Sequence, residues 1–125
     1  MLLLNFINLI NNLFFFSESF SNLPPRITDS KPIIQREEGS TVELPCAAQG
    51  YPIPTIKWTK NNIPLVNTID GRLNSDKKYI ELQGSLRIRK LILNDAGNYR
   101  CFVNNSVGSE MVETQLVVTS KSNYN

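Results

Sequence analysis

Apolar and polar residues alternate along two stretches that lie far apart in the chain. In residues 41–47 and again in residues 98–104, an apolar side chain occupies every second position, and each stretch carries one cysteine, Cys46 or Cys101, at such a position. Successive side chains of a β-strand point to opposite faces, so both cysteines are predicted to point inward from half-buried strands. Ile56 and Trp58 form a third inward-pointing pair between them.

Short apolar runs of this kind recur along the chain, separated by turn-forming residues. No stretch shows the periodicity of an amphipathic helix, so the pattern favours an all-β sandwich. Pro32 and the charges around it place the first strand, in two pieces, at a sheet edge. The expected strands cover residues 26–28, 33–36, 41–47, 55–60, 63–66, 78–82, 85–89, 98–104 and 110–118.

Prolines lead to two further expectations. Gly50, Pro52 and Pro54 predict a loop over residues 49–54. Pro45 lies inside an expected strand and has no backbone N–H, so a local irregularity is expected there.

Cys46 and Cys101 are the chain's two cysteines, and they either form a disulfide or remain two buried free thiols. Trp58 between them and Tyr99 two residues before the second fit two packed antiparallel sheets with the indole against a bridge, which favours the disulfide. Such a bridge would add about 4 kcal/mol of stability on the loop-entropy argument. Because it persists only in an oxidising compartment, we expect an extracellular location, as a secreted protein or a plasma-membrane ectodomain.

The charge and the residue types argue against several classes of function. The 13 basic and 11 acidic residues are interspersed and give a formal net charge of +2, which is typical of a solubilising surface rather than a nucleic-acid footprint. The chain has no histidine, which leaves no zinc site of the usual kind and no Ser-His or Cys-His nucleophile pair. We therefore expect no enzyme, no metal or cofactor, no nucleic-acid partner and no small-molecule substrate.

One motif carries a family resemblance. Leu86-x-Ile88-x-x-Leu91-x-x-x-Asp95-x-Gly97-x-Tyr99-x-Cys101, together with Trp58, resembles an immunoglobulin domain of the intermediate (I-set) type. The resemblance covers residues 24–119 and implies a Greek-key β-sandwich with one inter-sheet disulfide, in which Trp58, Leu86 and Tyr99 belong to the core. It also implies a tyrosine corner at Tyr99, whose hydroxyl bonds back to the chain upstream, and an ion pair between Asp95 and Arg72.

Further stretches narrow the resemblance. Residues 42–52, 84–89, 94–97, 103–108 and 112–114 look like those of an ectodomain repeat of the arthropod-type Down syndrome cell adhesion molecule (Dscam) family. That family implies homophilic adhesion in axon guidance and dendrite self-avoidance, with cell-surface immunoglobulin domains, including its own, as protein partners. Two alternatives remain open, which are a spacer domain of a larger receptor or matrix protein and a secreted single-domain ligand-binding or defence protein.

Three outward-pointing apolar residues are candidates for a binding surface. By alternation Phe102 points away from the core, beside the outward positions Met111 and Val117 of the last strand. A cluster of exposed apolar groups marks an interaction surface, whereas a single exposed phenylalanine is ordinary. On the other sheet, Glu43 is expected to lie across from arginines of the neighbouring strand, which favours a charge-balanced face over a polyanion-binding patch.

The sequon Asn104-Asn105-Ser106 makes Asn104 a candidate for N-glycosylation. Residues 1–21 are interpreted as a signal-peptide-like leader or as a spurious extension, because the apolar run is short and interrupted by asparagines. We expect no membrane span in this chain, and we expect residues 120–125 to form a flexible tail.

Overall fold

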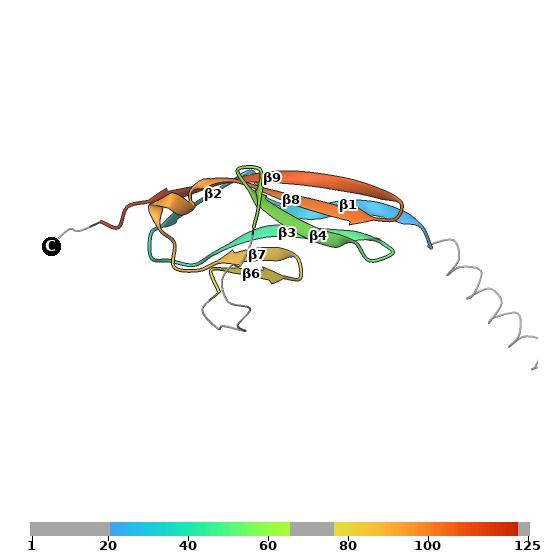
Figure 1. Cartoon of the computed structure of the whole chain (residues 1–125), viewed down its shortest axis with the longest axis horizontal. Helices are drawn as coiled ribbons and strands as arrows, with labels where there is room; N and C mark the ends of the chain where they lie inside the picture. The colour runs from blue at the N-terminus through green and yellow to red at the C-terminus, as the bar shows by residue number, and fades with distance from the viewer. Residues whose placement is uncertain (1–20, 66–76, 123–125) are drawn as a thin grey trace, which may run out of the picture.

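The computed structural model describes residues 21–65 and 77–122, and within them the chain forms two β-sheets that face each other (Figure 1). A four-stranded sheet has the order β1-β3-β7-β6, and a five-stranded sheet has the order β2-β9-β8-β4-β5. The predicted all-β immunoglobulin-like sandwich is therefore confirmed. The elements are β1 (Leu23–Ser30), β2 (Ile33–Glu37), β3 (Val42–Tyr51), β4 (Thr55–Lys60), β5 (Ile63–Pro64), β6 (Tyr79–Leu82), β7 (Ser85–Ile88), the 3-10 helix η1 (Leu93–Asp95), β8 (Gly97–Asn105) and β9 (Gly108–Thr119).

The N-terminal strand is divided between the two sheets. β1 pairs antiparallel with β3, whereas β2 pairs parallel with β9. Pro32 lies at the crossing and cannot donate a ladder hydrogen bond. The last strand holds the crossing in place, because Gln115 N donates to Pro32 O (2.8 Å) and Thr114 Oγ1 donates to Lys31 O (2.6 Å).

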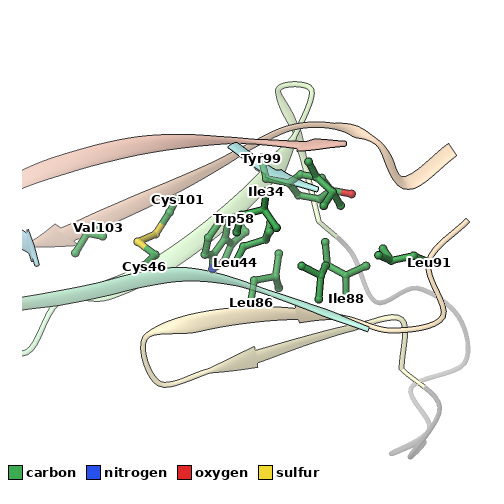
Figure 2. Close-up of a cluster of buried hydrophobic side chains, with 12 residues drawn as sticks. Ile34, Leu44, Cys46, Trp58, Leu86, Ile88, Leu91, Tyr99, Cys101 and Val103 are labelled. Atoms are coloured by element: carbon green, nitrogen blue, oxygen red, sulfur yellow. A yellow bond between two sulfur atoms is a disulfide. The ribbon is translucent and has the colours of Figure 1, made fainter. Parts of the chain in front are cut away.

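A disulfide joins the two sheets at the centre of the core. Cys46 of β3 and Cys101 of β8 are bonded, with their Cα atoms 6.5 Å apart, as predicted. Trp58 is the cross-strand partner of Cys101 and is buried beside the bridge (Figure 2). The buried apolar residues form one cluster made up of Ile34, Val42, Leu44, Cys46, Trp58, Leu86, Ile88, Leu91, Tyr99, Cys101, Val103 and Leu116.

Strand β3 is longer than its residues suggested. The prediction of a loop beginning at Gln49 is wrong for residues 49–51, because β1 pairs with β3 as far as Leu23 opposite Tyr51. Hydrogen bonding to this neighbour offsets the weak strand propensity of Gly50. A glycine is also needed there, since an added Cβ would come within 2.9 Å of Pro54 Cγ and 3.3 Å of Pro25 Cα.

Pro45 fits into this strand because of the side to which its nitrogen points. Cys46 N donates to Gly84 O on the β7 side (2.8 Å), so the nitrogen of Pro45 faces the β1 side. There the last registered pair is Ser30 opposite Cys46. The missing N–H therefore lies beyond the end of the ladder and leaves no partner unsatisfied.

Replacement of both bridging cysteines by alanine tests how much the disulfide stabilises the fold. We expect the Cys46→Ala/Cys101→Ala variant to lose about 2–5 kcal/mol of unfolding free energy, because the unfolded chain regains the freedom of the closed loop. Urea denaturation followed by tryptophan fluorescence measures the loss, with reduced wild-type protein as the control. A change smaller than about 0.5 kcal/mol would contradict the expectation.

Candidate recognition surface

The outward face of the five-stranded sheet carries a small apolar patch. Phe102 of β8 lies directly opposite Met111 of β9, and Lys57 of β4 flanks Phe102 on its other side. Met111 is 45% exposed, and Phe102 is half-buried. Directly opposed side chains on one face lie within contact distance of each other. The structure therefore brings together two of the three apolar residues predicted to form a binding surface.

Val117 does not join this patch. The pairing places it beside Gln35 of β2, six positions along β9 from Met111, which corresponds to about 20 Å of strand. The prediction that Val117 adjoins Phe102 is therefore wrong. Alternation correctly indicated that both residues point to the same face, but it carries no information about where along that face they lie.

Each sheet face carries one cross-strand pair of opposite charges. Arg100 Nε lies 2.9 Å from Glu113 Oε2 on the five-stranded sheet. On the four-stranded sheet Arg87 Nη2 lies 2.6 Å from Glu43 Oε1, which confirms the predicted cross-strand pairing. Since these side chains are partly exposed, the pairs add little stability, but each pair places opposite charges side by side on its face.

A buried corner supports the start of β8. Tyr99 Oη donates a hydrogen bond to Asp95 O (2.6 Å). Asp95 is itself buried, and its carboxylate accepts a hydrogen bond from Ile92 N (2.8 Å) and lies 2.5 Å from Lys78 Nζ. Arg72, the expected ion-pair partner of Asp95, lies outside the described residues. The Lys78 contact was not predicted, because no local pattern connects the two positions.

The environment of Tyr99 disfavours its ionised form. Burial is the main reason that the pKa of the Tyr99 hydroxyl is raised far above its ordinary value of 10.0, and Tyr79 and the Asp95 carboxylate raise it further. Burial, and to a smaller extent the Asp95 carboxylate, also raises the pKa of Tyr79. Neutral hydroxyls at this corner are therefore part of the folded state.

Asn104 is exposed on the same outward face as the apolar patch. It lies opposite Ser109 of β9 and Thr55 of β4, two residues along β8 from Phe102. A side chain in this position is open to modification, and a glycan attached to it would adjoin the Phe102–Met111 patch.

Asn105 has a structural role that sequence reasoning missed. Its Nδ2 donates to Leu23 O (2.7 Å) and Pro52 O (3.1 Å), and its Oδ1 accepts from Val107 N (2.9 Å) and Gly108 N (3.1 Å). This side chain thus ties together the start of β1, the β3–β4 turn and the β8–β9 turn. The sequon drew attention to the neighbouring Asn104, and no local signal marked Asn105.

Two kinds of feature were looked for in the part of the chain that the structure describes. Residues 21–65 and 77–122 contain no group of three or more Cys, Asp or Glu side chains placed to hold a metal ion. No helix among them is long and apolar enough to span a membrane.

The chain is similar to known proteins over most of its length. A model described as immunoglobulin domain matches residues 24–105. Cell adhesion molecule Dscam1 of Drosophila melanogaster is 41% identical over 106 residues, a match that covers 83% of this chain and 5% of Dscam1. Protein sidekick-1 of Mus musculus is 34% identical over 98 residues, covering 78% of this chain and 4% of sidekick-1. The chain thus spans a small fraction of the length of these curated relatives.

Solved structures show the same arrangement of strands. The structure of sidekick-1 immunoglobulin domains 1–4 superimposes with a TM-score of 0.68 at 35% identity, covering 78% of this chain and 25% of that one. The tandem immunoglobulin repeats of Dlar superimpose with a TM-score of 0.65 at 34% identity, covering 78% of this chain and 49% of that one.

The raised pKa of Tyr99 predicts a loss of stability in alkali. The pKa of Tyr99 is higher in the folded state than in the unfolded state. The stability that depends on its neutral hydroxyl is therefore fully present below about pH 10 and is lost as the pH rises further. Tyr99→Phe should lower the unfolding free energy at neutral pH by about 1–3 kcal/mol, because Asp95 O loses its donor, and should flatten the decline above pH 10. Urea midpoints between pH 7 and 11 measure both effects, with exposed Tyr51→Phe as the control. An equally steep decline in Tyr99→Phe would exclude this role.

Proposed function

The chain belongs to the immunoglobulin domain family, and from this membership we propose that it is an extracellular recognition module that binds another protein domain at a cell surface. The observation that carries the proposal is the 41% identity, over 83% of the chain, to a relative named as a cell adhesion molecule. The inter-sheet disulfide supports an oxidising, extracellular location. Adhesion by this module, rather than catalysis, is the function we assign.

We propose that the partner is a cell-surface immunoglobulin domain, including a second copy of this one, as in homophilic adhesion. The implied roles are those of the Dscam family, axon guidance and dendrite self-avoidance. The contact surface we assign is the Phe102–Met111 patch, because it exposes apolar side chains on a sheet face that also carries Lys57 and the Arg100–Glu113 pair. Exposed apolar groups surrounded by polar ones are typical of protein interaction sites.

A second candidate function is that of a spacer between other domains. It is favoured by the lengths of the relatives, since the chain matches only 5% of Dscam1 and 2% of human hemicentin-1. A spacer holds its neighbours apart and needs no binding face. The two functions differ in whether the Phe102–Met111 patch affects binding to cells.

The recognition face is tested by binding of the labelled soluble domain to cells that display the same chain. We expect Phe102→Ser to weaken binding at least about tenfold, because it removes the larger apolar group of the patch. Val117→Ser, on the same face but distant along β9, is the matched control and should bind normally. Equal binding of the two variants would refute this face, and absence of wild-type binding would favour the spacer.

We also propose that Asn104 carries an N-linked glycan, because it is exposed and is the acceptor residue of the sequon Asn104-Asn105-Ser106. Secretion of residues 22–125 from a eukaryotic host should add a glycan mass that peptide N-glycosidase removes. Ser106→Ala keeps Asn104 but breaks the sequon, and it should lack this mass. A wild-type mass equal to that of the bare polypeptide would show that the site is unused. The cell-binding comparison is best made in this Ser106→Ala background, in which no glycan adjoins the patch.

A further inference from the structure

The acceptor residue of the sequon and the larger residue of the apolar patch lie on one face of one strand. Phe102 and Asn104 are two positions apart on β8, and the buried Cys101 and Val103 alternate with them, so both side chains point outward. Residues two positions apart on a strand are separated by about 7 Å. A sugar ring joined to Nδ2 of Asn104 is long enough to reach across this distance to Phe102.

The side chains around Asn104 leave space for such a ring. Its cross-strand neighbours on this face are Thr55 of β4 and Ser109 of β9, which are both short, uncharged and exposed. Met111 lies diagonally across from Asn104 and is 45% exposed, and diagonal neighbours of this kind are about 7–8 Å apart. The direct neighbours of Asn104 therefore do not block a sugar from the Phe102–Met111 patch.

The patch also has the chemistry to hold a sugar. The first sugar of an N-linked glycan is N-acetylglucosamine, whose ring carries C–H groups on its faces and hydroxyl and amide groups at its rim. C–H groups pack favourably on the negative face of an aromatic ring such as that of Phe102, and the polarizable side chain of Met111 adapts to an irregular shape. Lys57, exposed and directly opposite Phe102, offers hydrogen-bond donors to the polar rim.

We propose that the first sugar of a glycan on Asn104 packs on Phe102 and Met111 and covers the recognition face. Because the sugar is tethered two residues from the ring, its effective concentration at the patch is about millimolar or higher, and a contact too weak to hold a free sugar can persist. The inference rests on the proposed recognition function and on the proposed glycan, and it adds regulation to both. Copies with an occupied sequon have a closed face, and copies with an empty sequon have an open one.

The contact is tested on secreted residues 22–125, which contain every described strand and all of the core. An endoglycosidase trims the glycan to its first sugar, and NMR measures the sugar's proton shifts. We expect upfield ring-current shifts that disappear in Phe102→Ser and persist in Val117→Ser, the matched control on the same face. Phe102→Leu keeps an apolar side chain without a ring and should lose the shifts as well, which guards against misfolding of the serine variant.

Urea unfolding measures the same contact as a free-energy coupling. The sugar should lower the unfolding equilibrium constant about threefold to tenfold relative to the bare Ser106→Ala domain, as expected for one aromatic contact. In the Phe102→Ser background the same comparison should give no change, because the partner of the sugar is gone. Absence of the ring-current shifts, an equal effect of the sugar in both backgrounds or an unoccupied sequon would each overturn the inference.

Cell binding separates the inference from the function on which it rests. On cells that display the Ser106→Ala chain, the glycosylated domain should bind at least about tenfold more weakly than the bare Ser106→Ala domain. Ser109→Ala, a neighbouring change that keeps the sequon, is the matched control and should bind as weakly as the glycosylated wild type. Equal binding of glycosylated and bare domains would refute the closed face. Absence of binding by the bare domain would instead count against the proposed function, while the NMR and unfolding results would still decide whether the sugar covers the patch.

Discussion

Two sheets that share no strand pairing are held face to face mainly by side chains, and in this chain the Cys46–Cys101 bridge is the covalent part of that contact. Around it a single apolar cluster fills the space between the sheets, with Trp58 against the bridge. Because inward positions alternate with outward ones, fixing the cysteines inward also fixes which side chains reach the solvent. The position of Phe102, the residue after Cys101, is set in this way.

The residues predicted the elements, the bridge and the Glu43–Arg87 pairing, but not the other contacts between distant segments. Alternation around Cys46 and Cys101 was sufficient to place both strands, since period-two burial is a local property, and the positions of Trp58 and Tyr99 favoured the disulfide between them. It could not show that Val117 lies far from Phe102, because register is decided by the partner strand. The continuation of β3 to Tyr51 depends on β1 in the same way.

Contacts made by single side chains between distant segments were harder still to predict. Asn105 orders one end of the molecule through contacts to Leu23 and Pro52, which are 82 and 53 positions away in sequence. The Lys78–Asp95 ion pair likewise joins two segments that no local pattern connects.

The path of the chain has a mechanical consequence. β1 begins at one end of the sandwich and β9 finishes at the other (Figure 1), so tension applied through the two ends acts along the length of the domain. The parallel β2–β9 ladder would then be sheared rather than peeled apart. Even after such rupture, the segment between Cys46 and Cys101, a separation of 55 residues, could not lengthen while its bridge is intact. Only the residues outside the bridged segment would extend, so the disulfide would limit how far the domain can lengthen under tension.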